Sequence, residues 1–352
     1  MDYQLSDRIN AIQPSPTLAV TQQGKDVIGL GVGEPDFDTP DFIKDAAIQA
    51  IHDGKTKYTA VDGIDELKDA VIKKLKRDNS LSYQRSEIIV SAGGKHSIFN
   101  LLSAWLNPGD EVVIPAPYWV SYPDMTKLVG ATPVIVKAGI DQRFKITPEQ
   151  LRNALTDKTR LMFINSPSNP AGTAYTANEL EALAEVLRDY PNVLIATDDM
   201  YEHILWSDSP FANFPMVAPD LKDRTVILTG VSKAYAMTGW RIGYAAGPKP
   251  IIAAAFKERH DYLVDALNSI DGIDCVPGDG TFYAFAQVDK LMTKANVSSD
   301  VELCEKLLTE ANVALVPGSA FGTDGYCRLS FATGMDVLKE AVKRIKSFSE
   351  SL

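Results

Sequence analysis

The sequence has few of the residues that form covalent cross-links and metal sites. Of its 352 residues only 3 are cysteines, and Cys275, Cys304 and Cys327 lie far apart along the chain. Their odd number and wide spacing argue against a disulfide framework or a zinc site, and fit a reducing compartment. The 4 histidines are scattered and form no cluster. The sequence therefore predicts no metal.

An excess of positive charge is also missing, as is any membrane or export signal. The chain has 35 Lys and Arg against 46 Asp and Glu, a formal net charge of -11, which argues against nucleic acid or an anionic membrane as partner. No apolar run is long enough to span a bilayer. The first residues carry Asp2 where a signal peptide needs basic charge. We expect a cytoplasmic protein.

Short apolar segments alternate with helical patterns between residues 88 and 246. Capping boxes at Thr147 and Thr176 predict two helix starts, and Thr39 with Pro40 predicts another, with Thr39 as N-cap. Strands are expected at 88–90, 111–115, 133–136, 161–165, 193–197 and 226–229. This alternation indicates an α/β fold with a mostly parallel sheet covered on both faces.

The pattern changes after Pro250. A long helix through Ile252 and Leu267 is followed by segments typical of antiparallel strands at 280–285, 313–318 and 328–331. Because 352 residues exceed what one core usually holds, we expect two domains. The predicted boundaries are a large α/β domain at 41–255 and a smaller α+β domain made of 1–40 and 256–352.

Polar residues follow several of the predicted strands where each ends. Asn169, Asp198 with Tyr201, and Ser232 with Lys233 stand at three such ends, and ligands bind beyond the carboxyl ends of strands in such sheets. A fourth strand ends in the turn 93–95 before a helix, which can offer backbone N–H groups to an anion. A lone Ser-Lys pair usually lies on a surface, so the inference depends on the combination.

A lysine, an aspartate, an arginine and an anion site are what pyridoxal phosphate (PLP) requires. The lysine forms a Schiff base with the cofactor, and the acid keeps the pyridine nitrogen protonated so that the ring accepts electrons. Once released from the cofactor, the amine can carry the proton removed from the substrate Cα.

The motifs as a set resemble those of the fold-type I, class I/II aminotransferases, most closely the bacterial aspartate aminotransferase branch. They occur in the family's order along nearly the whole chain. They are Gly33-Glu34-Pro35-Asp36-Phe37, Tyr58 in Lys-Tyr-Thr, Gly93-Gly94-Lys95, Pro117-Tyr118-Trp119 through Pro123, Asn165 through Pro170, Asp198 with Tyr201, Ser232-Lys233 through Arg241, and Arg328-Leu329-Ser330.

The resemblance implies the PLP-dependent transferase fold and a role for each motif residue. Lys233 would bind the cofactor covalently, with Asp198 and Tyr201 as the other catalytic residues. Asp198 would pair with the pyridine nitrogen, and Tyr201 and Asn169 would hydrogen-bond the phenolic oxygen. Trp119 would stack on the ring. The phosphate would be bound by Gly94, Lys95, Ser232, Arg241 and Tyr58, the last from a neighbouring subunit.

The same resemblance implies the substrates and the assembly. Arg328 and the backbone of Gly33 would bind the substrate α-carboxylate, and Trp119, Asn169 and Lys95 would also contact substrate. The implied reaction is ping-pong transamination between an amino acid, with aspartate preferred, and a 2-oxo acid, with 2-oxoglutarate preferred. A homodimer with shared active sites follows from the role of Tyr58.

Two departures from the family pattern bear on this interpretation. A segment that the family has before Phe256 is missing here, and the linker between Thr21 and Gly24 is short. Both changes predict weaker dimerisation or lower stability. The alternatives are an aminotransferase for prephenate or aromatic substrates, a PLP-dependent lyase or synthase, and a shortened, catalytically impaired homologue.

Overall fold

The computed structural model describes residues 33–276, 283–330 and 335–352, which separate into two compact units. The first unit ends at Ala255 and the second spans Phe256–Leu352, so the boundary falls within helix α10 (Lys249–Asn268). The short linker at 21–24 lies outside the described residues. The assignment of residues 1–40 to the smaller domain stays a prediction.

The first unit is built on a seven-stranded sheet with the order β1-β7-β6-β5-β4-β2-β3. The strands from β2 to β6 pair in parallel, and only β7 runs antiparallel to its neighbours. The strands are β1 (Ile88–Ser91), β2 (Glu111–Ala116), β3 (Thr132–Lys137), β4 (Thr159–Asn165), β5 (Leu194–Asp198), β6 (Thr225–Gly230) and β7 (Gly243–Ala246). The predicted mostly parallel sheet is therefore confirmed.

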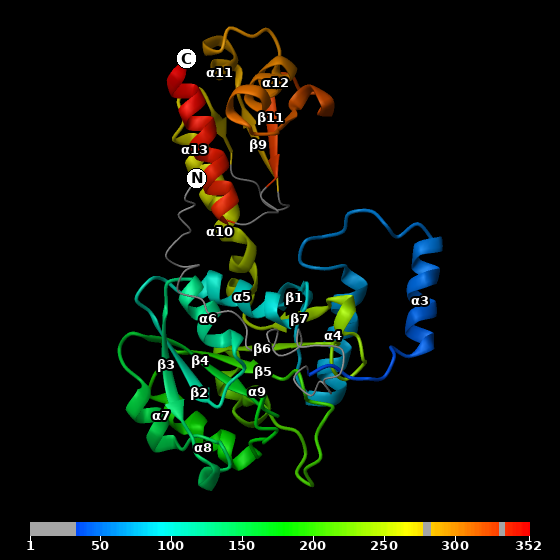
Figure 1. The fold of residues 1–352 in the computed structure, drawn as a ribbon, viewed down its shortest axis with the longest axis vertical. Helices are drawn as coiled ribbons and strands as arrows, with labels where there is room; N and C mark the ends of the chain where they lie inside the picture. Colours follow the sequence, from blue (N-terminus) through cyan, green and yellow to red (C-terminus); the bar gives the residue numbers. More distant parts are fainter. Residues whose placement is uncertain (1–32, 277–282, 331–334) are drawn as a thin grey trace, which may run out of the picture. The chain divides into compact units, whose positions relative to one another are not determined.

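Helices cover both faces of this sheet, which explains why its central strands carry buried apolar residues on both faces. Figure 1 shows α5 and α6 on one side of the strands and α7 and α8 on the other. Every residue of β5 is buried. The helices are α3 (Asp41–His52), α4 (Asp65–Asn79), α5 (Gly94–Trp105), α6 (Ser121–Leu128), α7 (Pro148–Ala154), α8 (Ala177–Arg188) and the one-turn α9 (Phe214–Val217).

Two of the three predicted helix N-caps form in the structure. Thr147 and Thr176 both form the predicted capping boxes, with Gln150 and Glu179 respectively. The prediction at Thr39 was wrong: Pro40 is the N-cap of α3 and Asp41 its first residue. The Thr39 hydroxyl instead donates to the carbonyl of Ala236 at 2.6 Å, so a tertiary partner has replaced the local one.

Helix α3 buries none of its residues within its own chain. Phe42, Ile48 and Ile51 of this helix are exposed. The helix stands apart from the sheet (Figure 1). No helix in the described part of the chain is long and apolar enough to cross a membrane.

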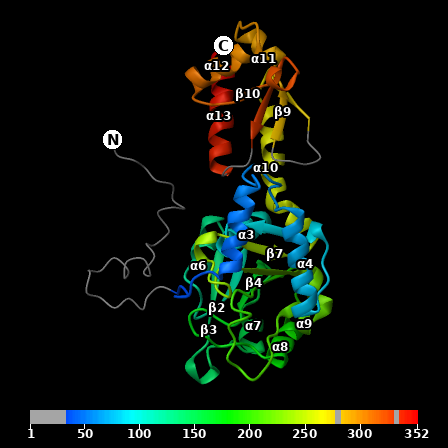
Figure 2. The ribbon, with the colours of Figure 1, turned by 90° about the vertical axis from the view of Figure 1, so that its right-hand side faces the viewer.

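The second unit is a four-stranded antiparallel sheet covered by helices. The strand order is β10-β11-β9-β8, with α12, α13 and the last turns of α10 packed into one core (Figure 2). Strand β10 is shorter than expected, with only Val316 and Pro317 paired. The elements are β8 (Asp274–Cys275), β9 (Tyr283–Gln287), α11 (Asp289–Lys294), α12 (Asp300–Ala311), β10 (Val316–Pro317), β11 (Tyr326–Ser330) and α13 (Met335–Ser351).

The buried ring of Phe163 allows a test of how much its packing in the sheet contributes to stability. It is 1% exposed in β4, and its ring stacks on Tyr122 with centroids 4.5 Å apart. We expect Phe163→Ala to lower the free energy of unfolding by about 3 to 5 kcal/mol, because the cavity cannot fully collapse. Urea denaturation of the variant measures this. Trp206→Ala is the control, since Trp206 is 90% exposed and should change stability by less than about 0.5 kcal/mol.

Candidate active site

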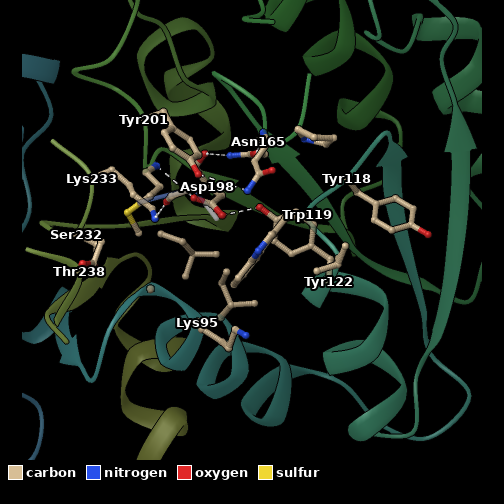
Figure 3. A pocket seen from close by; sticks show the side chains of 18 of the residues that line it. Lys95, Tyr118, Trp119, Tyr122, Asn165, Asp198, Tyr201, Ser232, Lys233 and Thr238 are labelled. Atoms are coloured by element: carbon tan, nitrogen blue, oxygen red, sulfur yellow. Dashed lines mark hydrogen bonds between the residues drawn. The ribbon is translucent and has the colours of Figure 1, made fainter. Parts of the chain in front are cut away.

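One pocket of the first unit, with a volume of about 640 Å³, lies beyond the ends of β4, β5 and β6 (Figure 3). Its size is in the range of cofactor and ligand sites. Ten of the residues predicted from the sequence line it: Gly33, Gly94, Lys95, Trp119, Asn169, Asp198, Tyr201, Ser232, Lys233 and Arg241. Side chains from distant segments therefore converge as expected for a parallel sheet.

Two predicted residues do not line this pocket. Tyr58 is 95% exposed, in the loop between α3 and α4. Arg328 belongs to the second unit, where its guanidinium lies 4.7 Å from the ring centroid of Phe321. The roles predicted for both stay predictions.

Asp198 ends β5 at the floor of the pocket. Its Oδ2 accepts a hydrogen bond from the Tyr122 hydroxyl at 2.5 Å, and its Oδ1 accepts one from the backbone N–H of Met200 at 3.2 Å. Burial raises the pKa of Asp198 to about 6, and these two hydrogen bonds oppose the rise. The carboxylate is thus buried and oriented, with only neutral groups as hydrogen-bond donors.

Tyr122 is a site residue to which the sequence assigned no role. Its ring packs edge-on against Trp119 at 5.5 Å and stacks on Phe163, which aims its hydroxyl at Asp198. Tyr122 and Asp198 are 76 residues apart. Only the position of Tyr122 within the family-like 117–123 motif pointed to it, since no local pattern predicts a contact over that distance.

We expect Tyr122→Phe to weaken activity mainly at low pH. The lost hydrogen bond favours the ionised carboxylate, so its removal raises the pKa of Asp198 and moves the acid limb of the kcat/KM profile to higher pH. At pH 6 kcat/KM should fall about tenfold, and at pH 8 by less. Tyr118→Phe is the matched control, because Tyr118 points away from the other pocket side chains (Figure 3). Parallel profiles of Tyr122→Phe and wild type would contradict this role.

A chain of amides links Asp198 to Tyr201. The Asn165 side chain donates to the Asp198 carbonyl at 2.9 Å and accepts from the Asn169 N–H at 2.7 Å. The Asn169 side chain in turn donates to the Tyr201 hydroxyl at 3.4 Å. Burial raises the pKa of Tyr201, so its hydroxyl stays protonated near neutral pH. The sequence pointed to Asn165 only as a member of a motif, whereas in the structure its side chain bonds both Asp198 and Asn169.

Lys233 lies in the loop after β6, and its amine faces the pocket. Nζ donates a hydrogen bond to the Gly33 carbonyl. Burial lowers the pKa of Lys233, and the positive charge of Arg241 lowers it further, against the opposing effect of Glu34. A lysine with a lowered pKa supplies neutral amine more readily, which is the form that attacks carbonyl carbon.

Close backbone packing forms an anion cradle beside Lys233. A Cβ at Gly93 would lie 2.1 Å from Nη2 of Arg241, and a Cβ at Gly243 would lie 2.4 Å from the N atom of Gly94. Gly94 begins the 12-residue helix α5, whose N-terminus attracts negative charge. Nη1 of Arg241 donates to the Thr238 carbonyl at 2.7 Å, which holds the guanidinium in place. The residues present fit a phosphate group.

Lys95 supplies a third cation to the pocket. Its Nζ lies 5.1 Å from the ring centroid of Trp119, a cation–π distance. The pocket therefore holds three cationic side chains, those of Lys95, Lys233 and Arg241, and one buried carboxylate, that of Asp198. Such a site suits a ligand with several negative groups and one positively charged ring atom.

Comparisons with known proteins agree with this arrangement. A family model described as "Aminotransferase class I and II" matches residues 25–255 and 252–345. An aspartate/prephenate aminotransferase of Nitrosomonas europaea is 53% identical, covering 97% of this chain and 99% of that protein. The aspartate aminotransferase of Geobacillus stearothermophilus is 44% identical over 99% of both chains.

Solved structures are similar over the same extent. The aspartate aminotransferase from Rhizobium meliloti has a TM-score of 0.70 at 41% identity, covering 99% of each chain. The Thermus thermophilus aspartate aminotransferase with maleate has a TM-score of 0.68 at 37% identity, covering 100% of each.

The same comparisons locate a gap. The alignment with the Nitrosomonas europaea protein runs over 392 positions, whereas 97% of 352 residues is about 341 residues. About 51 positions of that alignment therefore lie opposite gaps in this chain. The two pieces of the family match meet at residues 252–255, within α10.

Proposed function

The chain belongs to the class I and II aminotransferases, and on that premise we propose that it transfers an amino group from aspartate to 2-oxoglutarate with pyridoxal 5'-phosphate as cofactor. Aspartate is proposed as the donor because proteins that are similar to this chain over nearly its whole length have aspartate in their names. A cytoplasmic location is part of the same proposal.

One observation carries the proposal more than any other. Asp198 at the end of β5 faces the same pocket as Lys233 and Arg241 from the loop between β6 and β7. An acid, an amine and a phosphate-binding arginine in one cavity are the groups that PLP needs. A catalytically inactive binding protein would have no physical reason to hold all three groups together.

The roles of the residues follow from this arrangement. When bound, PLP supplies a carbonyl for the amine and an electron-accepting ring. Asp198 would hold the protonated ring nitrogen, and Arg241 with the N-terminus of α5 would bind the phosphate. Lys233 would bind the carbonyl carbon and, once released, move a proton at the substrate Cα. Tyr201 and Asn169 would donate hydrogen bonds to the ring oxygen.

Cationic residues would select the substrate. Lys95 lies beside Trp119 in the pocket and would face the distal carboxylate of aspartate. Arg328 would bind the α-carboxylate, with the backbone of Gly33 beside it. Each carboxylate would then have its own cation, which favours dicarboxylic acids over neutral amino acids.

A half-reaction titration tests the proposal. Aspartate is added to the PLP-loaded protein, and the visible absorption of the bound cofactor is followed together with oxaloacetate. We expect the band to disappear with one oxaloacetate formed per loaded site, and to return with 2-oxoglutarate. Ammonia or carbon dioxide in place of oxaloacetate would indicate a lyase instead, and no spectral change would indicate an impaired homologue.

Prephenate is proposed as a second acceptor, because several of the similar proteins are named aspartate/prephenate aminotransferases. In the same titration, prephenate should restore the absorption of the bound cofactor after aspartate has removed it. If 2-oxoglutarate restores the band and prephenate does not, the acceptor range is narrower than that of the named relatives.

We also propose a homodimer that is weaker than usual for the family. The exposed apolar residues of α3, with Phe42 at 74% and Ile51 at 63% exposed, suit burial against a second copy, and exposed Tyr58 is accessible to a neighbouring subunit. About 51 aligned positions are absent here compared with the Nitrosomonas europaea protein. Sedimentation velocity should show dissociation at micromolar concentration. A dimer that persists at nanomolar concentration would contradict the prediction.

A further inference from the structure

Two of the three cysteines meet in the core of the second unit. Cys304 lies on α12 and Cys327 on β11, and their Sγ atoms are 3.4 Å apart. Cys304 is 8% exposed and Cys327 is completely buried. The sequence alone predicted no pairing, because 23 residues separate them.

The third cysteine is too far from Cys327 to form a disulfide with it. Cys275 of β8 pairs in register with Ala286 of β9, and Cys327 of β11 pairs with the same Ala286 from the other side. Two strand spacings, about 9.6 Å, therefore separate the backbones of Cys275 and Cys327. A disulfide needs Cα atoms within about 7 Å, so Cys275 serves as a natural control.

The contact makes the two thiols chemically unequal. When the Cys327 thiol donates to Sγ of Cys304, this hydrogen bond lowers the pKa of Cys304 and raises the pKa of Cys327. The thiolate is the form that reacts with oxidants, so Cys304 is the expected nucleophile. Cys304 is also the one of the two with some exposure to solvent.

We propose that Cys304 and Cys327 form a reversible intramolecular disulfide when the protein meets a hydroperoxide. The Cys304 sulfur attacks the peroxide O–O bond and becomes a sulfenic acid, releasing water from hydrogen peroxide. Cys327 then loses its proton and attacks that sulfur, and the sulfenic oxygen leaves as a second water. Two thiols and one hydrogen peroxide thus give one disulfide and two waters, and a dithiol reductant reverses the change.

A disulfide at Cys327 would also affect Arg328, the next residue of β11. Cys327 and Leu329 point into the core, and Arg328 between them lies on the opposite face of β11. Closing the sulfur gap from 3.4 Å to about 2.05 Å pulls on the strand directly beside Arg328. If Arg328 binds the substrate α-carboxylate, a step that rests on the proposed function, oxidation should raise the KM for aspartate about tenfold with little change in kcat.

Peptide mapping tests the disulfide without any activity assay. The PLP-loaded protein is treated with hydrogen peroxide, alkylated and cut with trypsin, which separates the cysteines into peptides 260–290, 295–306 and 307–328. We expect the last two peptides joined and two hydrogen atoms lighter than their sum, with dithiothreitol separating them. A Cys275→Ala variant should give the same product and Cys304→Ala none. Unlinked peptides, or overoxidised Cys304 without the link, would overturn the site.

Kinetics then test the coupling to Arg328. Peroxide should raise the KM for aspartate in wild type and Cys275→Ala, and should leave it unchanged in Cys304→Ala. If the KM rises equally in Cys304→Ala, or if the linked protein keeps its KM, the coupling is wrong. Arg328→Lys separates this from the proposed function: an unchanged KM in that variant would refute the role of Arg328, while the mapping still decides the disulfide.

Discussion

Replacement of Lys233 by alanine is expected to lower kcat at least about 10⁴-fold, since one amine would both bind the cofactor and move the proton. The anion cradle at Gly94 and Arg241 does not depend on this side chain, so the variant should still bind PLP. The visible absorption of lysine-bound cofactor should be absent. Steady-state turnover and the spectrum of the loaded protein measure both effects.

Lys233→Arg is the matched variant, because it keeps the positive charge and removes the titratable amine. It should be as inactive as Lys233→Ala. Borohydride reduction adds a readout independent of turnover: in wild type, trypsin should release residues 225–241 as one peptide carrying the cofactor, since cleavage at the modified Lys233 is blocked. Cofactor found on Lys95 instead, or turnover of Lys233→Arg within tenfold of wild type, would contradict the role of Lys233.

Asp198→Asn is expected to lower kcat by about 10² to 10³-fold, since a fixed charge facing a developing charge is worth that much when desolvated. Asparagine keeps the size of the side chain and can still accept from the Met200 N–H. It cannot carry the negative charge that would hold the ring nitrogen protonated. The loss should therefore appear in kcat as well as in cofactor affinity.

The neighbouring Asp199→Asn variant is the control. Asp199 is also buried, with its pKa raised to about 7 by burial, but its carboxylate accepts from Thr197 at 2.6 Å and Asn213 at 2.7 Å, and it does not line the pocket. Its turnover should stay within a few fold of wild type. Equal losses in the two variants would mean that burial of a carboxylate, rather than its place in the pocket, is what matters.

Stability provides a second measurement on Asp198→Asn. The folded-state pKa of Asp198, about 6, lies above the ordinary value of 3.8, so the folded protein holds this proton more tightly than the unfolded chain. The contribution of Asp198 to stability is thus greatest below pH 4 and is lost as pH rises through 6. The variant without cofactor should gain up to about 3 kcal/mol over wild type at pH 8, and less at pH 4.

Much of the fold and most of the candidate site could be predicted from the sequence. The capping boxes at Thr147 and Thr176 formed as predicted because their partners are three residues away. Strand ends placed Asp198 and Lys233 at one crevice because parallel strands share a carboxyl edge. These are local or topological rules, and they need no knowledge of side-chain packing.

Tertiary structure decided the features that depend on distant partners. Thr39 does not cap α3 as predicted, because its hydroxyl donates a hydrogen bond to the carbonyl of Ala236, 197 residues away. Tyr122 became the hydrogen-bond donor to Asp198, because Trp119 and Phe163 orient its ring. Cys304 and Cys327 meet because α12 packs on β11. Sequence spacing cannot reveal such contacts, since packing energy is set by which surfaces the folded chain brings together.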